Sequence, residues 1–397
     1  MTPNGWALLK VEDLLEQVRT PVQVESDQLY REIGIRSHGK GIFHKEPVRG
    51  KTLGNKRVFE VIPGCFTLNI VFAWEQAVAK TSNAEEGFIA SHRFPQYQAK
   101  EDVACVDYLH RYFLSPKGKY LLGIASPGGA GRNKTLGQKE FGRVVIPTPP
   151  LSEQKKIARI LSTWDKAIET VDKLIENSQQ QKKALMQQLL TGKKRLPGFS
   201  GEWKEVRLGK VAQINPKKSA KPSDGLVSFI PMDAVSESAQ IISLATRNYD
   251  DVSKGFSAFA EDDVLVAKIT PCFENGKGAQ ATGLVNGVGF GTTEFHVIRG
   301  KQALHPRFIY YITKSYEFRF RGEANMQGSA GQRRVPTDFI KAYQIDLPPL
   351  EEQKAICTVL DANTSMLQAL HDQKAFATHE KQALMQQLLT GKRRVEV

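Results

Sequence analysis

The chain has 397 residues, more than the roughly 100 to 200 residues of a typical single domain, so we expect at least two separately folded parts. Apolar residues make up 41% and charged residues 24%, a balance that excludes a mainly disordered protein. The net charge of +13 and the pI of about 9.4 favour a polyanionic partner, and nucleic acid is a better candidate than an acidic membrane surface.

Cysteine spacing and hydropathy limit where the protein is expected to work. Cys65, Cys105, Cys272 and Cys357 lie far apart with no C-x-x-C pair, which argues against a zinc ribbon or a disulfide framework. No basic region leads into an apolar stretch at the start, and no apolar run approaches 18 residues. We therefore expect a cytoplasmic protein in a reducing compartment, with no membrane partner.

The first segment, residues 1–146, predicts an α+β domain, because short β-rich runs such as Arg57–Ile62 alternate with Gly-rich turns. Between Arg31 and Arg57, eight Lys and Arg residues face only two Glu residues, with glycines interleaved. Such a segment suits a phosphate backbone and guanine edges, although a solvated basic face explains any single residue equally well. The candidate DNA contacts are Arg31, Arg36, His38, Lys40, His44, Lys45, Arg132, Asn133 and Lys134.

Residues 147–195 predict a long helix. Two prolines precede it, Glu153 stands in its first turn and Gly192 ends it. Apolar residues recur at alternating steps of four and three, the pattern of a coiled-coil seam. The seam contains Ile157, Leu161, Trp164, Ile168, Val171, Leu185 and Leu189.

The second half of the chain repeats the first. Pro149–Lys155 recurs as Pro348–Lys354, and Ala184–Lys193 recurs letter for letter as Ala383–Lys392, both at an offset of 199 residues. Residues 346–397 therefore predict a second long helix, with a seam that is partly polar in its middle. From the repeat alone, a dimerisation coiled coil is an equally good explanation. The apolar seam positions are Ile356, Leu360, Leu367, Leu370, Leu384 and Leu388.

The segment between the two predicted helices, residues 196–345, predicts a second α+β domain that shares little with the first beyond its edges. Residues 268–277 place an aromatic, an acid, an amide and two lysines at an expected strand-to-turn junction. Asn pairs with adenine and Glu accepts from cytosine, so this stretch is a candidate for reading bases, although each residue could merely stabilise the turn. The candidates are Lys268, Thr270, Phe273, Glu274, Asn275, Lys277, Gln332, Arg333 and Arg334.

Motifs for catalysis are weak. The sequence has no phosphate-binding loop, no nucleophile elbow, no H-E-x-x-H and no Asn-Pro-Pro-[Tyr/Phe]. Glu153-x-Lys155 and its repeat resemble part of a nuclease motif, but a carboxylate in a first helical turn is explained by the helix dipole. His38 and His44 have no third ligand at a suitable spacing, so no metal site is expected.

The repeated Pro-Pro-Leu-x-Glu-Gln, followed by a helix that closes in Leu-Met-Gln-Gln-Leu-Leu-Thr-Gly-Lys, resembles the repeated regions of type I restriction-modification specificity subunits. Phe273–Lys277, Gly291–Phe295 and Val71–Glu75 also look like segments of that family's target recognition domains. The resemblance implies two recognition domains that each read one half of a split DNA sequence, with antiparallel helices that set the spacing. It also implies docking of two methyltransferase subunits, which bring S-adenosylmethionine, and of two ATP-driven motor-nuclease subunits.

We therefore predict an α+β fold in which two target recognition domains, residues 1–146 and 196–345, are joined by two long antiparallel coiled-coil helices, residues 147–195 and 346–397, in a pseudo-twofold repeat. The expected function is sequence-specific binding of double-stranded DNA without catalysis. No cofactor is expected in this chain, since S-adenosylmethionine, ATP and Mg²⁺ would belong to the partner subunits. A stand-alone DNA enzyme and a structural coiled-coil scaffold are the alternatives.

Overall fold

The computed structural model describes residues 2–128, 134–329 and 331–396. The chain divides into two compact units: the first contains Met1–Asp172 and Asp372–Val397, and the second contains Lys173–His371. The division falls inside the two long helices, α6 (Leu151–Leu189) and α12 (Leu350–Leu389). Each unit therefore combines one globular part with the beginning of one long helix and the end of the other.

The first unit is built mainly from short strands and short helices. Its globular elements are β1 (Ala7–Lys10), α1 (Val11–Leu14), β2 (Leu15–Val18), β3 (Leu29–Tyr30), β4 (Ile33–Ile35), β5 (Ile42–His44), β6 (Val48–Arg49), α2 (Gly50–Leu53), β7 (Val58–Glu60), β8 (Phe66–Leu68), η1 (Ala73–Glu75), β9 (Val78–Lys80), η2 (Asn83–Glu85), β10 (Ile89–Ser91), β11 (Gln96–Ala99), α3 (Val106–Leu114), α4 (Pro116–Ile124), α5 (Gln138–Gly142) and β12 (Val145–Thr148).

The second unit contains an equivalent series with a larger insertion of strands. Its globular elements are β13 (Lys204–Arg207), α7 (Leu208–Val211), β14 (Ala212–Ile214), β15 (Leu226–Ile230), η4 (Met232–Ala234), β16 (Ala245–Asn248), α8 (Tyr249–Val252), β17 (Ser257–Ala260), β18 (Val264–Ala267), β19 (Gly278–Gln280), η5 (Val285–Gly287), β20 (Val288–Gly291), β21 (Phe295–Gly300), α9 (Pro306–Lys314), α10 (Tyr316–Ala324), α11 (Thr337–Ala342) and β22 (Gln344–Leu347).

The sheets show which elements correspond. The first unit has a four-stranded sheet in the order β2-β11-β8-β9, and the second has β14-β21-β18-β19. A separate antiparallel pair closes each globular part, β1 with β12 and β13 with β22. In addition, the second unit carries the sheet β16-β15-β20-β17, where the first has the pair β10-β7. The repeat that the sequence predicts therefore extends into the globular parts, and the insertions differ.

A helical hairpin packs beside each four-stranded sheet, and a serine fixes its corner in both units. The Ser115 hydroxyl between α3 and α4 accepts from the Gly118 N–H, and the Ser315 hydroxyl between α9 and α10 accepts from the Phe318 N–H. These N-caps satisfy an amide that the new helix leaves free, so the chain turns at the same place in both repeats.

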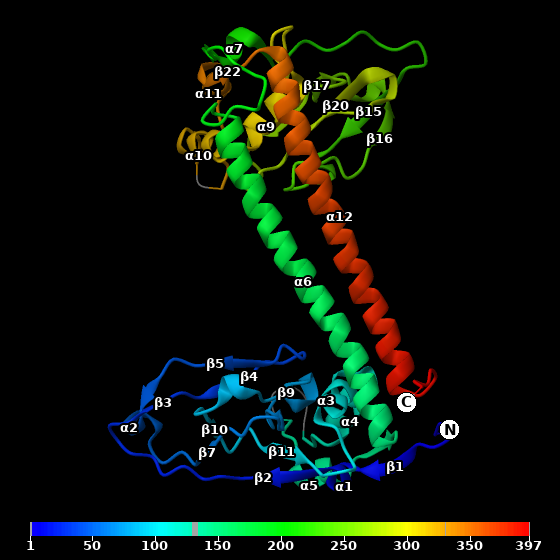
Figure 1. The fold of residues 1–397 in the computed structure, drawn as a ribbon. Coiled ribbons are helices and arrows are strands. Elements are labelled where there is room, and N and C mark those ends of the chain that lie inside the picture. The colour runs from blue at the N-terminus through cyan, green and yellow to red at the C-terminus, as the bar shows by residue number, and fades with distance from the viewer. Residues whose placement is uncertain (1, 129–133, 330, 397) are drawn as a thin grey trace. The chain divides into compact units, whose positions relative to one another are not determined.

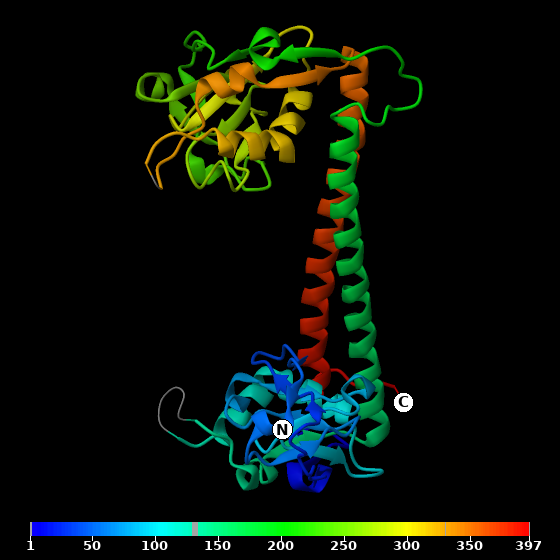
Figure 2. The same cartoon turned by 90° about the vertical axis from the view of Figure 1, so that its left-hand side faces the viewer.

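The two long helices run antiparallel. In the first unit, Lys374 pairs with Asp172 at 2.6 Å and Lys381 pairs with Asp165 at 2.5 Å, so residue numbers rise along α12 as they fall along α6. Both views of the chain show the helices side by side (Figures 1 and 2). The predicted fold class, two α+β parts with two long antiparallel helices in an internal repeat, is confirmed. The seam side chains that are buried are Ile157, Leu161, Val171, Leu189, Ile356, Leu360, Leu370 and Leu388. Those half-buried are Trp164, Ile168, Leu185, Leu367 and Leu384.

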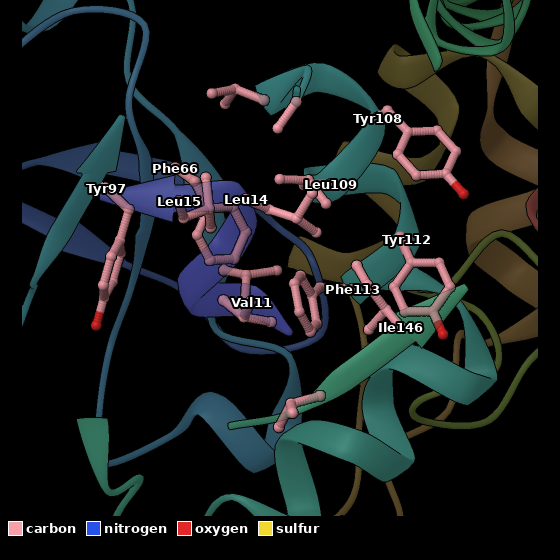
Figure 3. Close-up of a cluster of buried hydrophobic side chains, with 14 of the residues drawn as sticks. Val11, Leu14, Leu15, Phe66, Tyr97, Tyr108, Leu109, Tyr112, Phe113 and Ile146 are labelled. Carbon is pink, nitrogen blue, oxygen red and sulfur yellow. The ribbon is translucent and has the colours of Figure 1, made fainter. Parts of the chain in front are cut away.

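Each hydrophobic core joins a globular part to both long helices. In the first unit, side chains of α1, β2, β8, β11, α3 and β12 meet, including Leu14, Phe66 and Phe113 (Figure 3). Ile157 and Leu161 from the start of α6 join this core, as do Leu388 and Leu389 from the end of α12. The second core corresponds, with Ile356, Leu360, Leu189 and Leu190. Burial of these residues fixes both ends of each helix.

Candidate nucleic-acid interface

Three loops meet at one surface of each unit, which we call the three-loop surface. In the first unit it comprises residues 69–77 after β8, 92–95 after β10 and 134–137 before α5. In the second unit it comprises residues 268–277 after β18, 292–294 after β20 and 331–336 before α11. Loops between elements of a rigid scaffold are where proteins commonly carry binding residues.

Main-chain hydrogen bonds hold the three loops of the second unit together. The Thr270 N–H donates to the Arg333 carbonyl, and the Val335 N–H donates to the Lys268 carbonyl, each at 2.9 Å. The Lys268 N–H donates to the Glu294 carbonyl, also at 2.9 Å. Two groups of predicted DNA contacts that lie far apart in the sequence, residues 268–277 and 332–334, therefore belong to one surface.

Arginines and carboxylates alternate on this surface. Arg334 donates from Nε and Nη2 to the carboxylate of Glu294 at 3.0 and 2.8 Å, and these hydrogen bonds hold the pKa of Glu294 below its ordinary value. Nη2 of Arg333 lies 3.7 Å from Oε1 of Glu274. Both arginine side chains stay 42% exposed, so each can still reach a phosphate or a guanine edge. Glu294 lies in Gly291–Phe295, which resembles a segment of the family's recognition domains, but it was not among the predicted contacts because its pairing with Arg334 is not visible in the sequence.

The remaining predicted residues of the second unit divide into accessible and inaccessible ones. Asn275 is exposed and donates to Glu237 at 2.8 Å, while Lys277 donates to the Met232 carbonyl at 3.2 Å. Thr270 donates to Glu274 at 2.7 Å, and Gln332 is exposed. Phe273, in contrast, is 0% exposed and packs in the core, so the prediction that it touches DNA is wrong. Its aromatic ring is apolar core, and the turn around it carries the polar residues.

Arg319 of α10 forms hydrogen bonds with the main chain of that turn. Its guanidinium donates to the carbonyls of Thr313, Phe273 and Gly276 at 2.7, 3.1 and 3.3 Å. Burial lowers the pKa of Arg319 to about 10. In the first unit Gln76 makes a related link, donating to the Phe113 carbonyl at 3.0 Å. The helical hairpin therefore positions the loop between the two sheet strands in both units.

The three-loop surface of the first unit has a different chemistry. The Ile70 N–H donates to the Arg93 carbonyl at 3.0 Å and the Leu136 N–H donates to the Ile70 carbonyl at 2.8 Å. Lys134 lies over the Trp74 ring, 5.5 Å from its centroid. Residues of the loops 69–77 and 92–95 line a cavity of about 320 Å³. The cavity is lined by Glu32, Lys45, Lys56, Asn69, Val71, Phe72, Ser91, His92, Arg93 and Phe94. Of these, only Lys45 was among the predicted contacts, although Lys56 lies in the basic run and Val71 and Phe72 lie in a segment that resembles the family's recognition domains.

The structure distributes the other predicted residues of the first unit over the segment from β3 to β5. Arg31 lies over the Phe88 ring and Arg36 over the Phe43 ring, at 5.2 and 4.9 Å. His44 lies 2.9 Å from Glu85, and Lys45 lies 3.6 Å from Glu32. The His38 N–H donates to the Glu75 carbonyl, which joins this segment to the loop after β8, and Lys40 is exposed. Arg132 and Asn133 lie outside the described residues.

The duplicated Pro-Pro-Leu-x-Glu-Gln motif forms a clamp in each unit. Glu153 accepts from Trp6 at 3.1 Å and from two nitrogens of Arg394 at 2.8 Å. Glu352 accepts from Trp203 at 3.1 Å and from Arg195 at 2.5 and 2.7 Å. Both carboxylates are buried, so they join the start of a globular part to the end of a long helix. This contact accounts for a carboxylate that also resembled a nuclease motif.

The glutamine of the same motif makes a second duplicated contact. Gln353 donates to the carbonyls of Ala303 and Pro348, both at 2.9 Å, and accepts from the His305 N–H at 2.8 Å. Gln154 makes the same three contacts in the first unit, with Val103, Pro149 and Cys105. Each glutamine therefore ties the start of a long helix to the chain that leads into the helical hairpin.

Two kinds of feature are absent from the described residues. They contain no group of three or more His, Cys, Asp or Glu side chains placed to hold a metal ion. No helix within residues 2–128, 134–329 and 331–396 combines the length and apolar character needed to cross a membrane.

The family model of the type I restriction modification DNA specificity domain matches residues 65–177 and 200–375. The chain belongs to this family. The two matches each begin inside a globular part and extend into a long helix, so the specificity domain includes both a three-loop surface and a clamp glutamate.

Relatives of the specificity-domain family align with different parts of the chain. The type I restriction enzyme EcoAI specificity subunit of Escherichia coli is 32% identical over 277 residues, which cover 67% of this chain and 46% of that protein. The EcoEI specificity subunit of the same species is 36% identical over 189 residues, which cover 47% of this chain and 32% of the EcoEI subunit. These matches span less than half of either relative. The MjaVIII specificity subunit of Methanocaldococcus jannaschii is 25% identical, and the match covers 99% of this chain and 94% of the MjaVIII subunit.

Solved structures share the fold of this specificity-domain chain. The crystal structure of the HsdS subunit from Thermoanaerobacter tengcongensis has a TM-score of 0.55 and 18% identity, covering 99% of this chain and 98% of that one. A chain from a structure that describes complex assembly and conformational transition of the type I R-M system has a TM-score of 0.60 and 18% identity. The match covers 99% of this chain and 100% of that one. At these identities the likeness shows the fold alone.

Proposed function

We propose that this chain is the DNA-recognition subunit of a type I restriction-modification enzyme, and that each globular part reads one half of a bipartite site in double-stranded DNA. The observation that carries the proposal is the duplicated three-loop surface, which follows equivalent strands in both units. Residues 1–146 and 196–345 would be the two recognition domains.

The difference between the two surfaces favours two different half-sites. The second unit presents Arg333, Arg334 and Asn275, whose side chains match the hydrogen-bonding edges of guanine and adenine in the major groove. The first unit presents Phe72, His92 and Arg93 around a cavity. A common scaffold with unlike side chains suits a split sequence whose halves are not related.

The chemistry of modification and cleavage would belong to partner subunits. We propose that the chain is non-catalytic and binds no cofactor, and that two methyltransferase subunits supply S-adenosylmethionine while two motor-nuclease subunits use ATP and Mg²⁺. Membership in the specificity-domain family supports this division, as does the likeness to a chain from a type I assembly. Because the partner is DNA, the proposed place of action is the cytoplasm.

The first test removes a candidate base contact from one unit only. Arg333→Ala is expected to relax one half of the recognised motif and leave the other half unchanged, because an arginine that reads a base contributes about 1 to 3 kcal/mol of discrimination. Adenine methylation is mapped by single-molecule sequencing in cells that express the chain with its methyltransferase.

The matched control is Arg321→Ala, which removes an exposed arginine of α10 that pairs with Glu317 and lies outside the three-loop surface. An unchanged motif with Arg333→Ala, or a change in both halves, would contradict the proposed assignment of the second unit. Methylation without any sequence preference in the unaltered chain would reject recognition altogether.

The long helices are proposed to set the gap between the half-sites. A helix of 39 residues, the length of α6, is about 60 Å long at 1.5 Å per residue. Deleting seven residues, one heptad, from the middle of both α6 and α12 keeps the seam in register and is expected to shorten the preferred gap while both halves stay readable. Methylation mapping reports the gap directly, and an unchanged gap would show that the helices do not determine it.

A further inference from the structure

An open, basic groove lies beside the edge strand β14 in the second unit. Its volume is about 890 Å³, and it runs between β14, α7 and α11. Its lining includes six cations, Arg207, Lys210, Lys217, Arg299, Lys301 and Lys341. Among the described lining residues, Asp338 is the only acid.

Most of this charge is not neutralised within the protein. Arg299 is held by the buried carboxylate of Asp263 at 2.7 Å, and Lys341 lies 3.7 Å from Asp338. The other four, Arg207, Lys210, Lys217 and Lys301, form no salt bridge in the part of the chain that the structure describes, and all four are exposed. Like charges that face one another across a groove attract an anion with several charges.

The groove continues into the three-loop surface. A neighbouring cavity of about 420 Å³ shares Asn215 and Pro216 with the groove and is lined by Lys218, Lys268 and Thr293, of which the last two belong to that surface. Asn215 is fixed in place, since its N–H donates to the Val297 carbonyl at 2.7 Å and its side-chain oxygen accepts from the Val297 N–H at 2.9 Å. The basic track from Lys268 to Lys210 is therefore continuous.

We propose that this groove binds the sugar-phosphate backbone of DNA next to the half-site that the second unit reads. The inference rests on the proposed function, because it takes the three-loop surface as the place where bases are read. Lysines spaced along a groove and free of carboxylates suit a row of phosphates, which carry no sequence information. The groove therefore adds affinity and salt dependence without adding specificity.

The corresponding place in the first unit is smaller. Between β2 and α5, Gln17 donates to Gln138 at 3.0 Å, and Arg19 donates to both glutamines at 3.0 and 3.1 Å. The cavity that remains there is about 210 Å³. The proposed contact with flanking phosphates is therefore assigned to the second unit, where the groove is about four times as large.

The test uses the chain assembled with its methyltransferase and two duplexes, one carrying the mapped motif within random flanks and one of random sequence. Each lost phosphate contact lowers the slope of log affinity against log salt by about 0.9, so K210Q/K217Q is expected to reduce the slope by about 2 on both duplexes. Near 0.1 M salt, affinity falls roughly 10- to 100-fold. Ethylation interference beside the half-site of the second unit disappears, and the methylated motif stays the same.

The matched control is K183Q/K204Q, which removes the same charge from two exposed lysines of the second unit outside the groove and is expected to keep the ethylation pattern. An unchanged salt slope and ethylation pattern in K210Q/K217Q would overturn the inference. Loss of assembly with the methyltransferase at an unchanged slope would overturn it too, and would make the groove a protein-docking surface. Failure of the proposed function looks different, because the unaltered complex then shows no preference for any motif.

Discussion

Replacing Gln353 with alanine is expected to lower the free energy of unfolding of the second unit by about 3 kcal/mol, because three backbone groups, one of them buried, lose their hydrogen bonds to its amide. Gln353 is fully buried, and its amide joins the carbonyls of Ala303 and Pro348 to the N–H of His305. Water can replace the amide at the exposed Ala303, but at the buried Pro348 it cannot do so without opening the packing. Urea unfolding followed by circular dichroism measures the loss.

The same substitution can be made at the equivalent glutamine of the first unit, and an exposed glutamine of α12 serves as the control. Gln154→Ala is expected to destabilise the first unit by a similar amount, since its three contacts are the same. Gln386→Ala on the exposed face of α12 is expected to change stability by less than about 0.5 kcal/mol. If Gln353→Ala and Gln386→Ala unfolded at the same urea concentration, the glutamine contact would not hold the helix start.

Replacing Arg319 with methionine is expected to disorder the turn at residues 271–276 and to abolish reading of the half-site assigned to the second unit. The guanidinium links the Phe273 and Gly276 carbonyls of the turn to the Thr313 carbonyl of α9. Methionine fills similar volume but donates no hydrogen bond, so three carbonyls lose a partner at a cost of about 3 kcal/mol. Methylation mapping together with thermal unfolding separates the loss of specificity from the loss of stability.

Arg321→Met is the matched control, two residues further along α10 and exposed. Arg319→Lys keeps the charge and part of the hydrogen bonding, so partial recovery of the motif is expected. A normal motif in Arg319→Met would mean that the turn needs no support from α10, and the role assigned to Arg319 would be wrong.

The long helices could be predicted from the sequence because their determinants are local and duplicated. The residues of the repeated motif recur at one offset, and the apolar seam residues follow one another at alternating steps of four and three. The role of Glu153 could not be predicted, because its partner Arg394 lies 241 residues away and only the folded chain brings them together. The helix dipole favours the Glu153 carboxylate in a first helical turn, but it does not account for the contacts of Glu153 with Trp6 and Arg394.

The three-loop surfaces were predicted only in part, for a different reason. Residues 268–277 and 332–334 were singled out by side-chain chemistry, but chemistry alone does not distinguish a ring that stacks on a base from one that packs in a core, as Phe273 does. In the first unit the basic run from Arg31 to Arg57 is apparent in the sequence, whereas no local pattern marks Arg93. Clusters of charge are visible in a sequence, whereas surfaces assembled by long-range strand pairing are not.

The burial of both ends of each long helix has a consequence for how the helices open. An isolated helix frays from its termini, where hydrogen bonds are missing and side chains have fewest neighbours. Here Glu153 and Ile157 near the start of α6, and Leu189 at its end, are almost fully buried, whereas Ser178 and Lys182 interrupt the apolar seam between them. Amide protons at the ends should therefore exchange with solvent more slowly than those around this polar stretch, the reverse of ordinary helix fraying.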